Sequence, residues 1–262
     1  MYPSLKQSWE LFGIFLLINL IVSLIVLILN ELFVISDYVS GWITLAAYLA
    51  GFLPIIFYTK YMSLSQKFDY CKLTGKPPVW LLITLVVFVP AMTISVDSIV
   101  SLVPMPETLE QLFAKMISPN LSSFLTVVIA APILEELLCR GIILKGLLTH
   151  IAPYKAIVWS SLIFAAMHLN PWQGIAAFII GFISGWLFWK TKSIIPSIFI
   201  HFLNNGFAFI LLLILDDPTL TLPEILGNKY IVVLCLASFI FLAGLFLIFK
   251  QFEQRRNLEV KN

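Results

Sequence analysis

The chain is poor in charged residues and has no long polar stretch. Only 11% of its 262 residues are charged, whereas 60% are hydrophobic and the mean hydropathy is +1.00. A single soluble core cannot bury that much apolar surface, so the composition excludes an ordinary soluble globular protein. The net charge of +2 is small and scattered, which leaves no basic face for nucleic acid. These shortages indicate a membrane protein.

Several familiar motifs are also missing. The three cysteines, Cys71, Cys139 and Cys235, show no paired spacing and no CxxC motif, so neither a disulfide framework nor a cysteine metal site is predicted. No HExxH motif is present, which excludes the common zinc-protease arrangement of soluble enzymes. We find no convincing internal repeat, and this argues against a transporter built from two related halves.

Long apolar runs are abundant. A helix needs about 20 mostly apolar residues to cross a hydrocarbon core that is roughly 30 Å thick. The sequence therefore predicts an all-α, polytopic membrane protein with about eight transmembrane helices, forming a single integral-membrane domain over residues 1–262. The runs lie near residues 11–33, 42–59, 79–103, 121–147, 155–169, 172–189, 193–215 and 230–249.

The positive charges predict how the chain is oriented. With the amino terminus inside, 13 of the 16 lysines and arginines fall on inner segments, and two, Lys115 and Lys229, fall on outer loops. Arg140 is left within a span or at its inner end. This bias predicts that both termini are cytoplasmic and that the number of spans is even. We expect a multi-pass protein of the plasma (inner) membrane.

Three ionisable residues interrupt the fourth apolar run, in the stretch ILEELLCRG at residues 133–141. Each charged side chain near the bilayer centre costs about 2.5–3.5 kcal/mol, so these groups need compensation. Glu136 and Arg140 are four residues apart and share one helix face, which predicts an ion pair. Glu135 has no cation at helical spacing on its own segment. Its partner must therefore come from another helix.

Two histidines in other runs are candidates for that partner. His168 and His201 each lie roughly 14–20 Å from the nearest inner lysine at the helical rise per residue, which puts both near the middle of the membrane. Asn205 follows His201 by four residues and shares its face. Pro132 lacks an amide hydrogen, so the carbonyl of Val128 loses its α-helical partner and the helix can kink there.

These groups suit the hydrolysis of an amide bond. Attack by water needs a base, a donor for the developing oxyanion and shelter from bulk solvent. The same residues could instead bind a divalent metal such as zinc, with Glu135, His168 and His201 as ligands and a water in the fourth position. The residues alone leave both the metal-dependent and the metal-free mechanism open.

Three ordered motifs resemble those of the CPBP (CAAX protease and bacteriocin-processing/immunity, or Abi) family of intramembrane proteases, also called type II CAAX prenyl endopeptidases. The family's EExxxR motif is matched by EELLCR at residues 135–140, its FxxxH motif by FAAMH at 164–168, and its HxxxN motif by HFLNN at 201–205. The resemblance covers about residues 120–210 and implies a four-helix catalytic core within the membrane domain.

The resemblance implies a role for each motif residue. Glu135 and His168 would activate the hydrolytic water, His201 and Asn205 would stabilise the oxyanion, and the ion pair that follows Glu135 would brace the site. It leaves the cofactor open, because the family has been described with both metal-dependent and metal-free glutamate mechanisms. The catalytic residues implied in this way are Glu135, Glu136, Arg140, His168, His201 and Asn205.

We therefore predict an intramembrane endopeptidase. Its partners would be the lipid bilayer and a peptide or protein substrate at the inner leaflet, of CAAX type or otherwise membrane-associated. A non-proteolytic membrane scaffold or bacteriocin-immunity protein is the first alternative. A proton-coupled carrier is the second, since carboxylates and histidines within the membrane also form proton relays.

Overall fold

The computed structural model describes residues 2–65, 75–109, 119–215 and 221–259, and all regular structure in these ranges is helical. Six helices in this part of the chain are long and apolar enough to cross a membrane. The predicted all-α, polytopic membrane fold is therefore confirmed, while the count of eight spans and the cytoplasmic termini stay predictions. Cys71 and Lys115 lie outside the described residues.

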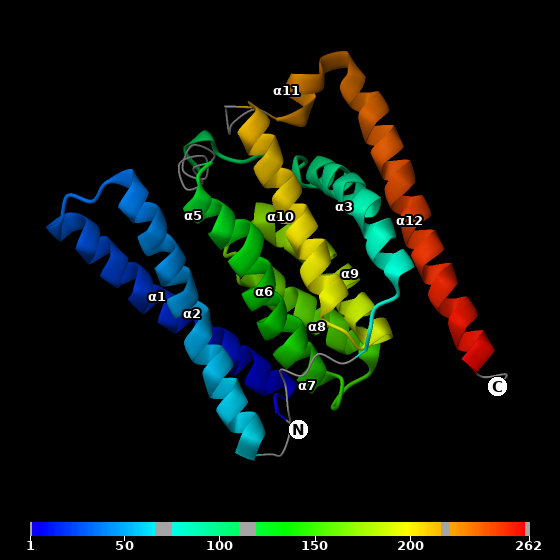
Figure 1. Ribbon diagram of the computed structural model, residues 1–262, viewed down its shortest axis with the longest axis horizontal. Helices are drawn as coiled ribbons and strands as arrows, with labels where there is room; N and C mark the ends of the chain where they lie inside the picture. The colour runs from blue at the N-terminus through cyan, green and yellow to red at the C-terminus, as the bar shows by residue number, and fades with distance from the viewer. Residues whose placement is uncertain (1, 66–74, 110–118, 216–220, 260–262) are drawn as a thin grey trace.

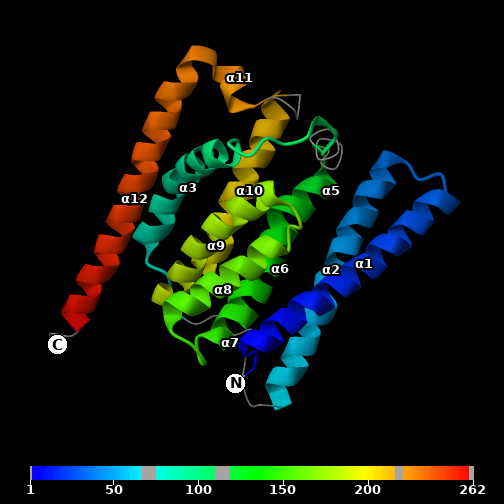
Figure 2. The same cartoon turned by 180° about the vertical axis from the view of Figure 1, so that it is seen from behind.

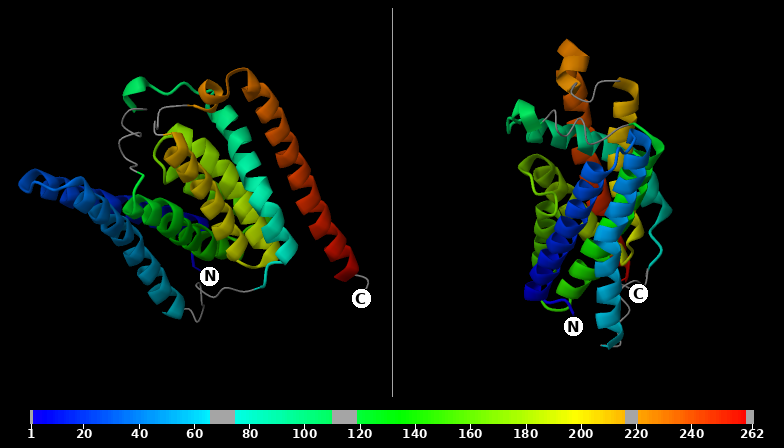
Figure 3. Two further views of the ribbon diagram at one scale, coloured as in Figure 1. Left: turned by 45° about the horizontal axis from the view of Figure 1, so that its top comes forward. Right: turned by 90° about the vertical axis from the view of Figure 1, so that its left-hand side faces the viewer.

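The helices form one bundle flanked by two pairs (Figure 1). The hairpin of the first two helices lies on one side, and the third packs against the last on the other side (Figure 3). The first helix begins, and the last helix ends, at the same end of the bundle (Figure 2). The long helices are α1 (Leu5–Leu32), α2 (Asp37–Ser65), α3 (Val79–Val100), α8 (Pro153–Ala166), α9 (Pro171–Thr191), α10 (Ile195–Leu215) and α12 (Tyr230–Glu259), and the short α11 (Leu222–Leu226) and η3 (Gly227–Lys229) precede α12.

The central helix contains two π-helical stretches. Asn120 caps its start by accepting a hydrogen bond from the amide of Ser123 at 2.9 Å. Hydrogen bonds in a π-helix run from residue i to i+5, and such stretches are frequent at functional sites. Along the chain the helix consists of α5 (Leu121–Ser123), η1 (Phe124–Ala130), α6 (Ala131–Glu136), η2 (Leu137–Leu144) and α7 (Lys145–Leu147).

Pro132 frees a backbone carbonyl, though not the one predicted. The amide of Ala131 donates to the carbonyl of Thr126, so the hydrogen bonds here follow the i→i+5 register. In that register the carbonyl of Val127 faces residue 132, and proline has no hydrogen to donate. The prediction for Val128 assumed α-helical pairing. The Val127 carbonyl instead accepts a hydrogen bond from Asn205 Nδ2 on α10 at 2.8 Å.

Two glycines allow α9 to approach its neighbours closely. A Cβ at Gly185 would lie 3.2 Å from Ile157 on α8 and 3.3 Å from Leu144 on η2. A Cβ at Gly181 would lie 3.0 Å from the guanidinium of Arg140. Small residues at this spacing are typical of close helix packing in membranes. Gly181 therefore also determines how near Arg140 can come to α9.

Candidate active site

A fully buried ion pair lies at the centre of the bundle. Arg140 Nη1 donates to Glu136 Oε1 at 2.9 Å, and both side chains are 0% exposed. The predicted pair is thus confirmed. Arg140 Nη2 also donates to the carbonyl of Gly181 at 3.0 Å, and the guanidinium carbon lies 4.6 Å from the centre of the Phe164 ring. These contacts offset the cost of burying the guanidinium.

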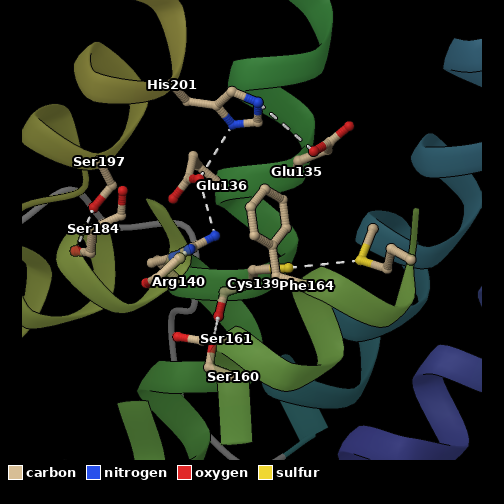
Figure 4. A network of polar contacts seen from close by, with 12 residues as sticks. Glu135, Glu136, Cys139, Arg140, Ser160, Ser161, Phe164, Ser184, Ser197 and His201 are labelled. Carbon is tan, nitrogen blue, oxygen red and sulfur yellow. Dashed lines mark hydrogen bonds and ion pairs between the residues drawn. The ribbon is translucent and has the colours of Figure 1, made fainter. Parts of the chain in front are cut away.

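His201 lies between the two glutamates (Figure 4). Its Nδ1 is 3.3 Å from Glu136 Oε1, and its Nε2 is 3.9 Å from Glu135 Oε2. A carboxylate can only accept, so Nδ1 carries a hydrogen and donates it to Glu136. The imidazole is 7% exposed. Glu136 therefore fixes the direction in which Nε2 points, which is towards Glu135.

Glu135 obtains its compensation from two other helices, as its lack of a cation on its own segment predicted. Oε1 accepts a hydrogen bond from the hydroxyl of Tyr48 on α2 at 2.5 Å. Oε2 is buried and has no hydrogen-bond partner among the described residues, although His201 Nε2 faces it. The side chain is 13% exposed. One carboxylate oxygen is thus engaged and the other is directed at an imidazole.

Tyr48 is the site residue that the sequence analysis missed. It lies in the apolar run at 42–59, where a buried tyrosine hydroxyl requires a hydrogen-bond partner. That requirement was the available signal. It could not identify Glu135 as the partner, because the two residues are 87 positions apart in the chain.

His168 lies beside the same aromatic ring as His201. The Phe164 ring makes edge contacts with both imidazoles, with ring centres 5.2 Å apart for His168 and 5.6 Å for His201. His168 Nδ1 is 3.0 Å from the carbonyl of Phe164, so this nitrogen carries a hydrogen and Nε2 can accept. Within the described ranges, no ion pair joins His168 to Glu135 or Glu136.

The turn between α8 and α9 holds His168 in place. Asn170 donates from Nδ2 to the carbonyl of His168 at 2.8 Å, and its Oδ1 caps α9 by accepting from the amide of Gln173 at 2.8 Å. Leu169, which lies between His168 and Asn170, adopts a left-handed backbone conformation with φ +55°. This conformation is uncommon for leucine. The backbone next to His168 is therefore fixed at some conformational cost.

Asn205 belongs to a chain of polar contacts across three helices. Its Nδ2 donates to the Val127 carbonyl at 2.8 Å, and its Oδ1 accepts from Asn204 Nδ2 at 3.1 Å. Asn204 in turn accepts from the hydroxyl of Thr93 on α3 at 2.9 Å. An amide nitrogen carries two hydrogens, so the bond to Val127 leaves one for another acceptor. The side chain is held in one orientation by both neighbours.

The predicted metal ligands are not brought together. Among the described residues, no three His, Cys, Asp or Glu side chains form a group that could hold a metal ion. Glu135 Oε2 and His201 Nε2 face each other at 3.9 Å, whereas within the described ranges no ion pair joins His168 to Glu135. The residues present therefore do not fit the three-ligand zinc site considered from the sequence.

An apolar pocket of about 220 Å³ lies next to this cluster, between the central helix and α10. On the central helix its lining begins about two turns before Glu136, and on α10 it includes the residue that follows His201. Its walls contain no charged side chain, which suits a hydrocarbon group. The lining residues are Val128, Ile129, Pro132, Ile133, Ile195, Ile198, Phe199 and Phe202.

Apolar helices enclosing a carboxylate, an imidazole and a buried ion pair define a class of polytopic membrane protein with an ionisable cluster inside its bundle. Comparison with known families agrees with this class. Residues 117–207 match the family described as type II CAAX prenyl endopeptidase Rce1-like, so the chain contains a CPBP-family domain over these residues. All six predicted catalytic residues fall inside the matched segment. Comparisons with curated proteins and with solved structures give no match.

A domain of this family implies a peptidase with a protein substrate. The family domain and the six long apolar helices together support a multi-pass membrane protease. The buried contact between Glu136 and His201 is compatible with that activity.

Proposed function

We propose that the chain is an intramembrane endopeptidase in which Glu135 activates a water molecule to attack a peptide bond. The observation that carries the proposal is the state of Glu135 Oε2. This oxygen is buried, has no hydrogen-bond partner among the described residues, and lies 3.9 Å from His201 Nε2. A carboxylate oxygen left unpaired in a sheltered site is suited to accept a proton.

The charges of the cluster suggest the protonation state of His201. Two carboxylates and one guanidinium would leave one buried negative charge, and an uncompensated buried charge is costly. A doubly protonated His201 removes it, with Nδ1–H donating to Glu136 and Nε2–H directed towards Glu135. In this state Nε2–H is a charged donor at the place where an oxyanion would form.

The reaction then proceeds in two proton transfers. Glu135 Oε2 removes a proton from water as the oxygen attacks the carbonyl carbon, and His168 Nε2 orients the same water through its other hydrogen. His201 and the second Nδ2 hydrogen of Asn205 donate to the developing oxyanion. Glu135 next gives its proton to the amide nitrogen as the carbon–nitrogen bond breaks. Both products leave with the carboxylate regenerated.

The roles of the remaining pair follow from burial. Glu136 holds the His201 ring by its Nδ1 hydrogen, and Arg140 holds Glu136 in place by donating to its Oε1. Both side chains are 0% exposed, whereas that of Glu135 is 13% exposed, so Glu135 is the more accessible carboxylate. We assign to both the positioning of His201, in agreement with the bracing role that the resemblance implies.

A peptidase assay with a matched carboxylate control tests the proposal. Purified protein in liposomes is given an internally quenched reporter peptide that ends in a farnesylated CAAX sequence, and cleavage is followed by fluorescence. We expect Glu135→Gln to lower kcat by about 10²–10⁴-fold, because the general base is lost. Glu31→Gln, which changes an exposed glutamate on α1, should retain wild-type activity. Equal cleavage by wild type and Glu135→Gln would reject the proposal, and no cleavage by wild type would favour a non-proteolytic scaffold or immunity role.

A further inference from the structure

The first helical hairpin contributes a residue to the site. Tyr48 lies on α2, 69 positions before the family-matched segment begins at residue 117, yet its hydroxyl donates to Glu135 Oε1 at 2.5 Å. α2 packs along α5, η1 and α6, so this contact lies within a helix interface. No motif of the matched segment accounts for it.

The position of the Tyr48 ring is well determined. It packs against Phe52, one turn further along α2, with ring centres 4.9 Å apart and planes inclined by 34°. Phe52 is itself 2% exposed and contacts Phe15 of α1, with ring centres 4.9 Å apart. Phe52, supported by Phe15, therefore holds the Tyr48 ring with its hydroxyl at the carboxylate. The phenol cannot turn away without disturbing the packing of the hairpin.

This hydrogen bond makes the two oxygens of Glu135 unequal. Oε1 is occupied by the tyrosine hydroxyl, whereas Oε2 is directed at His201 and has no hydrogen-bond partner among the described residues. Without the hydroxyl, the carboxylate could rotate about its terminal torsion, which is broad and roughly two-fold for glutamate. The direction of Oε2 would then no longer be fixed.

We propose that Tyr48 is a positioning residue for the proposed hydrolysis: it binds Glu135 Oε1 and so makes Oε2 the oxygen that accepts the proton of water. The inference rests on the proposed function and adds a residue from outside the family domain to the site. The first hairpin is accordingly part of the functional unit. Tyr48 acts through Glu135 and need not contact substrate.

Steady-state kinetics with the farnesylated reporter peptide test the role in catalysis. Tyr48→Phe keeps the ring and removes only the hydroxyl, so KM should stay unchanged while kcat falls about tenfold, the equivalent of one hydrogen bond of about 1.4 kcal/mol. Tyr58→Phe is the matched control, because Tyr58 lies on the same helix and is 44% exposed. This control should keep both constants. An unchanged kcat in Tyr48→Phe would overturn the inference even if Glu135→Gln is inactive.

A thermal-unfolding cycle tests the contact without relying on activity. Tyr48→Phe should lower Tm in the wild-type protein, whereas in a Glu135→Leu background it should leave Tm unchanged or raise it, because the hydroxyl there has no acceptor. Equal Tm losses in both backgrounds would overturn the inference. A wild-type protein that fails to cleave the reporter would count against the proposed function, and the cycle would still decide whether Tyr48 and Glu135 interact.

Discussion

Replacing Asn205 by leucine should destabilise the fold through a backbone carbonyl on another helix. Asn205 Nδ2 is bonded to the carbonyl of Val127 at 2.8 Å, and Pro132 denies that carbonyl a partner within the π-helical register. Asn205→Leu therefore leaves a carbonyl unpaired inside the membrane. Leucine is similar in size, so the change introduces little additional cavity.

The expected loss can be estimated from two kinds of measurement. Leaving a buried polar group without a hydrogen bond lowers the free energy of unfolding by about 1–3 kcal/mol. Individual hydrogen bonds between membrane helices contribute about 0.6 kcal/mol on average and at most about 1.7 kcal/mol. We expect Asn205→Leu to lower the free energy of unfolding by about 1–2 kcal/mol, because no backbone amide can replace Asn205 as the donor to the Val127 carbonyl. For a chain of this size that is a Tm decrease of roughly 2–8 °C.

Thermal unfolding of the purified protein in detergent measures the effect, and a second background isolates its cause. Pro132→Ala restores an amide hydrogen, so Val127 regains a backbone partner whether the segment stays π-helical or becomes α-helical. Asn205→Leu should then cost clearly less. Asn30→Leu, at an exposed position of α1, serves as control and should leave Tm nearly unchanged. The same Tm loss with and without Pro132 would refute the reasoning.

Three further changes test other parts of the site by thermal unfolding. Gly181→Ala places a methyl group 3.0 Å from Arg140 and 3.1 Å from Phe164, so it should lower Tm. An unchanged Tm would mean that the Arg140 guanidinium can move aside without loss of stability. Arg140→Met leaves Glu136 without its cation and should cost about 3–5 kcal/mol, whereas Arg140→Met combined with Glu136→Leu should recover much of that loss. Leu169→Asn should raise Tm by roughly 2–4 °C, because asparagine tolerates the left-handed conformation better; a lower Tm would show that the leucine side chain contributes more than the strain costs.

Local relationships in the sequence were predictable. The Glu136–Arg140 pair follows from helical spacing alone, since both partners lie on one segment. The same geometry showed that Glu135 lacked a local cation, which led to His168 and His201 as candidate partners, and the structure places His201 Nε2 opposite Glu135 Oε2. These inferences need only the rise and rotation of a helix.

Relationships between distant segments were not predictable. The contact between Tyr48 and Glu135 depends on how α2 packs against the central helix, and apolar helices in lipid carry little pattern that specifies their neighbours. The arrangement of the two imidazoles around Phe164 has the same origin. The sequence indicated a similar depth for His168 and His201, but it could not show that His201 is the one within 3.9 Å of Glu135 or that both pack against Phe164.

The count of spans depended on assuming regular α-helices. α8 has 14 residues, fewer than the roughly 20 that a full crossing requires. The fourth apolar run is helical over residues 121–147, as predicted, but the π-helical stretches η1 and η2 interrupt the α-helical hydrogen bonds of its backbone. Proline at position 132 signalled an irregularity without specifying its register. The helix propensities of the residues do not distinguish a proline kink from a π-helical turn.

The two π-helical stretches have a consequence for insertions and deletions. Removing one residue from a regular helix turns everything beyond it by about 100°, which would move Glu135 and Glu136 to the wrong face. An i→i+5 turn contains one residue more than an α-helical turn, so it can lose a residue by tightening. Because η1 precedes the glutamates, a deletion within it can leave their direction intact, whereas one within α6 cannot. Length variants of the chain should therefore be tolerated at the π-helical turns before they are tolerated anywhere else along the central helix.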